Sequence, residues 1–309
     1  MNQQPKWAEL TQFGLLGFTG NDARAFLHGQ LSCDVERLGA GHACYGSYNT
    51  PQGRVLASFL LWCDVRGYFM QLPRSLCTSI CQRMAKFILR SKVKAADLSA
   101  EHTLIGVAGG HAATILKAMF SAIPKAPLTL SSEREANVLR LDAQRFVIAA
   151  PIAQAPALRA ALAKDAAAVG ESAWDWLDIR AGIPYVTPAT QERFVPQAAN
   201  LDLIGGVSFE KGCYPGQEIV ARMHFRGKLK ERMYLAHIAA VTAPRPGDRL
   251  YSAEMGDQAT GTIVNAAPSS GGGYDALAVI HISSVHAGNV RLGAPDGPLL
   301  TFLPLPYQP

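Results

Sequence analysis

The stretch of this sequence that says most about its fold runs from residue 211 to residue 218 and reads Lys-Gly-Cys-Tyr-Pro-Gly-Gln-Glu. Proline fixes φ near the value needed at the second position of a β-turn, and glycine tolerates the positive φ of the third position. We therefore predict a type II turn over Tyr214, Pro215 and Gly216. This turn places the thiol of Cys213 on a loop instead of inside a helix or strand.

Two cationic residues, Lys211 and Arg222, lie near Cys213 in the sequence. A neighbouring cation favours the thiolate, which is the nucleophile and the metal ligand, whereas apolar surroundings favour the neutral thiol. Free cysteines are also among the most buried residues of folded proteins. Cys213 is therefore either a displayed, reactive thiol or a small residue packed beside the turn, and the residues alone leave both interpretations open.

The composition is that of a folded globular protein, with 49% hydrophobic and 17% charged residues in a chain of 309. This length exceeds one typical core, so we expect two or three domains. We see no signal peptide and no apolar run long enough to span a bilayer, which predicts a cytoplasmic protein with no membrane association. The six cysteines show neither a Cys-x-x-Cys pair nor zinc-like spacing, so we predict no metal site. The net charge of +5 is too small to indicate a nucleic-acid partner.

Three regions differ in pattern, and we predict an α+β domain over residues 1–100, a second over 101–227 and a small β-barrel over 228–309. In the first, a helix follows Pro73, and its apolar stripe includes Cys77, Cys81 and Phe87. In the last, prolines and glycines separate short apolar runs that read as strands. These runs are residues 229–240, 249–252, 261–266, 276–281 and 299–303.

Several stretches closely resemble the YgfZ family, folate-binding proteins of the wider group that includes the glycine-cleavage aminomethyltransferase. They comprise residues 178–184, 194–197, 200–201, 206–209, 211–218 and 220–222, with residues 18–20, 26–31 and 53–56 nearer the N-terminus. The resemblance implies an α+β fold with ferredoxin-like domains around a central folate cavity and a small C-terminal β-barrel. It also implies tetrahydrofolate as the cofactor, and a role in assembling or repairing iron–sulfur enzymes, including one that modifies tRNA.

The resemblance also implies which residues form the site. Cys213 would face the folate as the reactive thiol, with Lys211 beside it, and the aromatic rings of Phe13 and Trp174 would lie near the pterin. Further folate contacts are implied for motif residues and their neighbours: Tyr214, Gln217, Glu218, Arg222 and Arg226.

One departure from the wider group bears on catalysis. Aminomethyltransferases are similar around residues 53–56 but continue with paired aspartates, where this chain has Ala57 and Ser58. Neither residue can act as a carboxylate base or stabilise a cationic carbon, so direct aminomethyl transfer is disfavoured. Arg180 likewise replaces an acidic residue of the transferases. Whether the chain is an enzyme stays open, and a one-carbon transferase with a different acid or base is the alternative.

Cationic residues also occupy every other position from Arg222 to Arg232, with apolar residues between them. If this stretch is extended, its period of two places the cations on one face. Their partner would be the carboxylates of a folate polyglutamate tail, a phosphate backbone or an acidic protein. An RNA-binding module is thus a further alternative, and a solvated strand edge is the interpretation without any partner.

Overall fold

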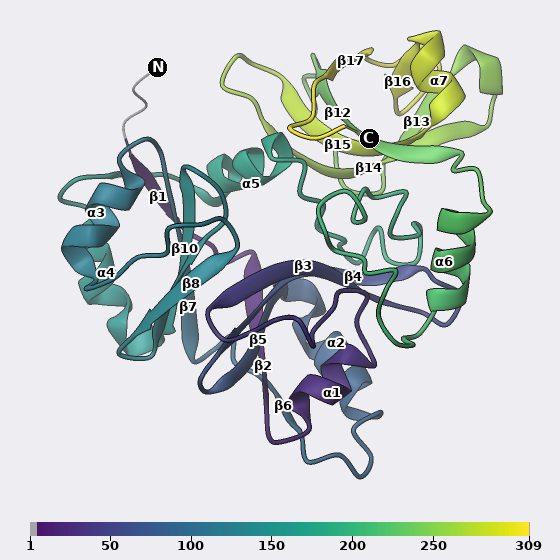
Figure 1. Cartoon of the computed structure of the whole chain (residues 1–309). Helices are drawn as coiled ribbons and strands as arrows, with labels where there is room; N and C mark the ends of the chain where they lie inside the picture. Colours follow the sequence, from purple (N-terminus) through teal and green to yellow (C-terminus); the bar gives the residue numbers. More distant parts are fainter. Residues whose placement is uncertain (1–4, 309) are drawn as a thin grey trace. The chain divides into compact units, whose positions relative to one another are not determined.

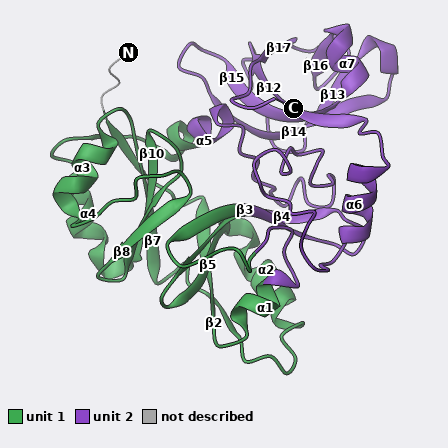
Figure 2. Cartoon of the chain, in the orientation of Figure 1, with its two compact units in different colours: residues 1–27, 35–44, 59–174 green, residues 28–34, 45–58, 175–309 purple. Residues whose placement is uncertain are grey.

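The structure is a computed structural model, and it describes residues 5–308 as a mixture of helices and strands (Figure 1). The chain divides into two compact units, each built from three separate segments (Figure 2). Unit 1 contains residues 1–27, 35–44 and 59–174, and unit 2 contains residues 28–34, 45–58 and 175–309. No helix within residues 5–308 is both long enough and apolar enough to cross a membrane.

Unit 1 is built on strands that belong to an eleven-stranded sheet of order β11-β1-β7-β10-β9-β8-β3-β4-β5-β2-β6. The boundary between the units falls within α1 (Ala23–His28), β3 (His42–Asn49), β4 (Val55–Asp64) and the helix α5 (Glu171–Arg180). The other strands of this sheet are β1 (Lys6–Glu9), β2 (Phe13–Thr19), β5 (Gly67–Pro73), β6 (Lys94–Asp97), β7 (His102–Ala108), β8 (Thr129–Glu133), β9 (Ala136–Arg140), β10 (Arg145–Pro151) and β11 (Ala167–Ala168).

Helices cover strands of unit 1 through buried apolar side chains. The helices are α1 (Ala23–His28), α2 (Arg74–Ala85), α3 (Ala112–Met119) and α4 (Ala155–Leu162), with a 3-10 turn at Ile152–Gln154. Ile115 and Leu116 of α3 and Leu158 of α4 share one core with residues of β7 and β10. All ten residues of β4 are buried, which agrees with their nearly continuous apolar sequence.

Unit 2 contains a second sheet of six strands in the order β16-β13-β14-β15-β12-β17. Its elements are α6 (Gln217–Phe225), β12 (Glu231–Ile238), β13 (Arg249–Ser252), a 3-10 turn at Ala253–Met255, β14 (Ala259–Pro268), β15 (Tyr274–His281), α7 (Ile282–Ala287), β16 (Val290–Leu292) and β17 (Leu300–Leu303). The five strands expected beyond residue 228 are confirmed as β12 to β15 and β17, whereas β16 was not expected. The α+β class is confirmed, and the three-domain division stays a prediction.

A buried carboxylate ties α5 to the C-terminal sheet inside unit 2. The Asp275 side chain on β15 accepts a hydrogen bond from the indole N–H of Trp176 at 2.8 Å. Its other oxygen lies 2.9 Å from Nδ1 of His237 on β12, and the Arg180 guanidinium is 3.7 Å from the oxygen that Trp176 binds. Because Asp275 is only 3% exposed, these three partners stabilise a charge that water scarcely reaches.

Two local expectations were wrong. Residues 222–232 do not form one strand, because Gly216 starts α6, which buries Val220 in the core and continues to Phe225 before β12 begins at Glu231. Phe87 is not part of the buried stripe of α2, because that helix ends at Ala85 and the chain turns away. Phe87 is 49% exposed as a result.

Candidate functional site

The predicted turn is present and leads directly into α6. Gly216 has φ of 81° and ψ of 2°, the values of the third position of a type II turn. The amide of Gln217 donates to the carbonyl of Tyr214 at 3.1 Å and closes the turn. A Cβ at position 216 would lie 2.5 Å from both Gly53 Cα and the Thr50 carbonyl oxygen, so the close approach requires glycine here.

Lys211 anchors the other end of the motif. Its ammonium donates to three carbonyl oxygens, of His28 at 2.5 Å, Leu31 at 2.6 Å and Cys33 at 3.0 Å. The same ammonium lies 5.0 Å from the centroid of the Tyr214 ring. These carbonyls use all three N–H donors of a lysine, so the geometry gives Lys211 an anchoring role. Its role in chemistry stays a prediction.

Cys213 lies between these two anchors and is exposed. Its flanking residues Lys211 and Tyr214 are buried, at 9% and 6% exposure. The other five cysteines are buried or half-buried, and burial raises the pKa of the Cys77 thiol to about 11. The structure therefore displays the Cys213 thiol and does not pack it into the core.

Two buried polar groups near the turn have no partner within residues 5–308, namely the Tyr214 hydroxyl and both ends of the Asn49 side-chain amide. Burial also raises the pKa of Tyr214, with a smaller contribution from Cys33, which keeps the phenol neutral. Asn49 is only 2% exposed, and its neighbour Thr50 touches Gly216. A buried polar group without a partner is costly, so each of these groups is a candidate for a hydrogen bond to a polar ligand. Asn49 was not predicted, since only the folded chain brings it to the motif.

Ala57 and Ser58, the residues at the positions of the aminomethyltransferase aspartates, are buried. Ala57 and Ser58 are 0% and 1% exposed. The Ser58 hydroxyl donates to the carbonyl of Pro184 at 2.8 Å and accepts from the amide of Val186 at 2.9 Å. Ser58 therefore holds the 184–186 segment in place and offers no free group to a substrate.

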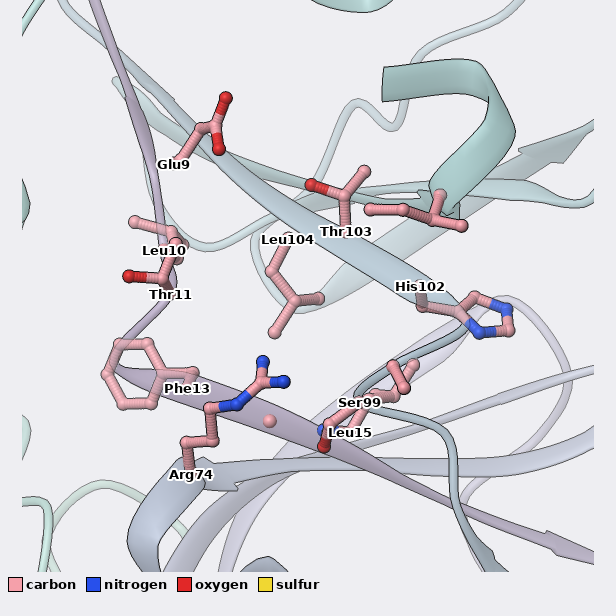
Figure 3. A pocket seen from close by; sticks show the side chains of 13 residues that line it. Glu9, Leu10, Thr11, Phe13, Leu15, Arg74, Ser99, His102, Thr103 and Leu104 are labelled. Atoms are coloured by element: carbon pink, nitrogen blue, oxygen red, sulfur yellow. The ribbon is translucent and has the colours of Figure 1, made fainter. Parts of the chain in front are cut away.

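Phe13 lines a cavity of about 220 Å³ in unit 1. Figure 3 shows Phe13 and Arg74 beside this cavity, with His102 and Leu104 of β7 contributing further side chains. Burial lowers the pKa of His102, with Arg66 adding to the shift, so its ring is neutral at pH 7. The cavity thus combines an aromatic ring, a cation and a neutral imidazole.

Trp174 belongs to the core of unit 1 and is 2% exposed. A Cβ at Gly106 would lie 2.3 Å from the indole, so the ring packs directly against the backbone of β7. The structure places Phe13 and Trp174 in unit 1 and the motif residues in unit 2. The folate contacts predicted for all of them stay predictions.

The cations after the motif are not on one face. Arg222 on α6 and Arg226, the residue that caps its C-terminus, line a shallow groove with Glu218, Ala221 and Phe225. His224 turns elsewhere and stacks on Phe209 at 3.8 Å between ring centroids. Gln217 also leaves this face, because its side-chain amide donates to the Lys211 carbonyl at 3.2 Å.

Arg232, the last cation of the stretch 222–232, already has partners within the protein. Arg232 forms an ion pair with Asp202 at 2.7 Å and also donates to the carbonyl of Gln197 at 2.8 Å. The condition for a single cationic face, an extended stretch from Arg222 to Arg232, is therefore not met, because a helix, a loop and a paired arginine replace the strand. Within residues 5–308, no three His, Cys, Asp or Glu side chains gather in a way that could hold a metal ion.

Comparisons with known proteins agree with this geometry. No family model matches the sequence. The tRNA-modifying protein YgfZ of Enterobacter sp. (strain 638) is 32% identical over 304 residues, which cover 97% of this chain and 92% of that protein. Among solved structures, the glycine cleavage system aminomethyltransferase T from Bartonella henselae superimposes with a TM-score of 0.80 at 17% identity. That match covers 98% of this chain and 85% of the transferase, and it shows a shared fold.

Proposed function

This chain belongs to the YgfZ family, and from that premise we propose that it is a tetrahydrofolate-binding accessory protein for tRNA modification. In this proposal it supports the assembly or repair of iron–sulfur enzymes, including those that modify tRNA, and the Cys213 thiol is the group that meets the client enzyme. The family name and the aminomethyltransferase fold support the folate-related role.

The observation that carries the proposal is that Cys213 is exposed on a loop held in place on both sides. Its loop is fixed on one side by the Lys211 ammonium and on the other by the packing of Gly216 against Gly53. A protein that needed only a small core residue here would not leave the thiol exposed between two such anchors. The rigid loop positions a thiol for contact with a second molecule.

The residues of unit 2 fit a polar, flat ligand such as the pterin ring. The free donor and acceptor of the Asn49 amide match the donor–acceptor edge of a pterin, and the Tyr214 hydroxyl adds a second hydrogen-bonding group. Tetrahydrofolate, when bound, supplies a reduced pterin that carries one-carbon groups. Glu218, Arg222 and Arg226 of unit 2 would contact its polar tail. The pterin contacts of Phe13 and Trp174, which belong to unit 1, are a separate prediction.

The experiment measures folate binding and support of the client enzymes separately. We expect the Cys213→Ala variant to bind tetrahydrofolate like the wild type in calorimetric titration, but to lose rescue of tRNA modification in a strain that lacks the protein. We expect Asn49→Ala to weaken binding by tenfold or more, because a hydrogen bond to a buried group is lost. Full rescue by Cys213→Ala would refute the role of the thiol.

Phe13 and Trp174 are tested in the same titration. Phe13→Leu and Trp174→Phe keep apolar volume, so a specific loss of affinity would reveal a stacking role. Unchanged affinity in both variants would remove these two rings from the folate site.

A one-carbon transferase is the competing function. It would have to work without Ser58, whose hydroxyl is already engaged with Pro184 and Val186. Turnover of a folate one-carbon donor by purified protein with an acceptor would favour the transferase over the accessory role.

A further inference from the structure

A second surface, in unit 1, carries more uncompensated charge than the α6 face. It is the turn between α2 and β6 with its flanking residues, and we call residues 83–94 the basic tip (Figure 1). No Asp or Glu occurs in the sequence from residue 65 to residue 96. The basic tip contains five exposed cations: Arg83, Lys86, Arg90, Lys92 and Lys94.

None of these five side chains forms an ion pair or a hydrogen bond with another residue in the range 5–308. Two carboxylates on neighbouring segments already accept hydrogen bonds from other groups. Asp22 accepts from the backbone amide of Lys92 at 2.7 Å. Asp97, at the end of β6, accepts from the amide of Ser99 at 3.0 Å and from the hydroxyl of Thr78 at 3.4 Å. The charge of the basic tip is therefore available to a partner.

Two large apolar side chains stand among these cations. Phe87 is 49% exposed and Leu89 is 88% exposed, although both are residues that normally lie in a core. Leu89 also has φ of 44°, a left-handed conformation that is rare for a branched side chain. The turn therefore holds apolar side chains out in water in the middle of a cationic surface.

We propose that the basic tip binds RNA at unpaired bases. Five cations without counter-charges fit a polyanion, and an exposed aromatic ring offers a platform on which a base stacks. Sequence-tolerant RNA contacts commonly combine these two features. The inference rests on the proposed function only for its choice of RNA as the polyanion, through the link to tRNA modification.

The α6 face is the weaker candidate for this role, although the sequence pattern first pointed there. Glu218 lines the same groove as Arg222 and Arg226, and Glu231 follows shortly after. These carboxylates weaken the attraction of the α6 face for phosphates. They suit a ligand that also carries hydrogen-bond donors. The basic tip has no such carboxylate among its own residues.

The experiment is a salt titration of RNA binding by full-length protein, followed by the anisotropy of a fluorescein-labelled, unmodified tRNA transcript. For contacts to single strands, each phosphate contact adds about 0.7 to the slope of log K against log salt. We expect the double variant Arg83→Ala/Arg90→Ala to lower the slope by about 1.4. The matched control, Lys125→Ala/Lys164→Ala, removes two exposed cations elsewhere in unit 1 and should keep the wild-type slope.

The stacking contact has its own variant. Phe87→Leu keeps an apolar side chain but removes the aromatic face, so we expect affinity to fall by about fivefold or more with the slope unchanged. A fully paired RNA duplex of the same length should bind more weakly than the transcript, because its bases are not available for stacking.

Several outcomes would overturn the proposal. One is the absence of wild-type binding to the transcript, or a slope unaffected by Arg83→Ala/Arg90→Ala. Another is a smaller salt slope in Arg222→Ala/Arg226→Ala but not in Arg83→Ala/Arg90→Ala, which would place the RNA contact at α6. Binding to phosphatidylglycerol vesicles without binding to RNA would assign the basic tip to a lipid surface. The readout uses neither folate binding nor rescue by Cys213, so its failure is distinct from failure of the proposed function.

Discussion

Lys211 acts as an internal cap for the loop that follows α1. Three carbonyls of residues 28–33 point at one ammonium, and hydrogen bonds to a charged group contribute about 1.5–3 kcal/mol each. We expect Lys211→Met to reduce the free energy of unfolding by at least about 3 kcal/mol in urea titration, because the carbonyls lose their donor. Lys228→Met, at an exposed lysine, should change it by less than about 0.5 kcal/mol. Equal effects would remove the capping role.

The thiols should differ in their rates of alkylation. Cys213 is exposed, whereas Cys77 is buried and has its pKa raised to about 11, so little of it is thiolate at pH 7. We expect iodoacetamide to modify Cys213 first and Cys77 last in native protein, as followed by peptide mass spectrometry. In denaturant all six cysteines should react at similar rates. Early labelling of Cys77 would contradict its burial.

His102 links stability to pH. Burial, with a contribution from Arg66, lowers its pKa in the folded protein, so below pH about 6.5 the unfolded chain takes up a proton more readily than the folded chain. Stability should therefore fall as the pH drops from about 7.5 to about 5.5. We expect His102→Gln to lose less stability over this interval, measured as the shift of the urea midpoint. Equal shifts in both proteins would mean that other groups dominate.

At the level of elements, the junction of turn and helix depends on a glycine contact. Gly216→Ala forces a side chain into the left-handed region and toward Gly53 Cα and the Thr50 carbonyl, both at 2.5 Å. Gly205 has a similar φ of 75°, but a Cβ added there would meet no atom within 4 Å, which makes Gly205→Ala the matched control. The control should lose about 1–2 kcal/mol, and Gly216→Ala at least about 2 kcal/mol more. Urea unfolding measures both, and similar losses would show that the contact relaxes.

The same elements show what the sequence could predict. The Pro215-Gly216 turn was predictable, because its geometry follows from two adjacent residues. The helix α6 was missed because alternating cations imitate the period of a strand, although Arg222 and Arg226 also have helical spacing. The carbonyl partners of Lys211 lie 178 to 183 residues away in the sequence, and no local pattern connects them. Likewise, Asn49 became a candidate only when folding left its amide without a partner.

At the scale of the molecule, each unit has its own core, and perturbations should stay within a unit. Asp275→Ala removes the carboxylate that binds Trp176 and His237. Breaking such a buried network typically costs about 3–5 kcal/mol. We expect hydrogen exchange to accelerate in β12 and β15 of unit 2 while β7 and β10 of unit 1 keep their protection. Faster exchange in β7 and β10 as well would show that the units unfold together.

The chain path through the two units also governs the order of events on the ribosome. Lys211 binds the carbonyl of His28 across 183 residues, so the early segments of unit 2 leave the ribosome long before their partners. At synthesis rates of about 5–20 residues per second this delay is roughly 10–40 s. For most of this interval the nascent chain carries Val55 without the later residues of unit 2 that bury it. We therefore expect chaperones that bind exposed apolar chain to associate with this nascent segment, because a fold that interleaves its units leaves the segment unburied until later residues are made.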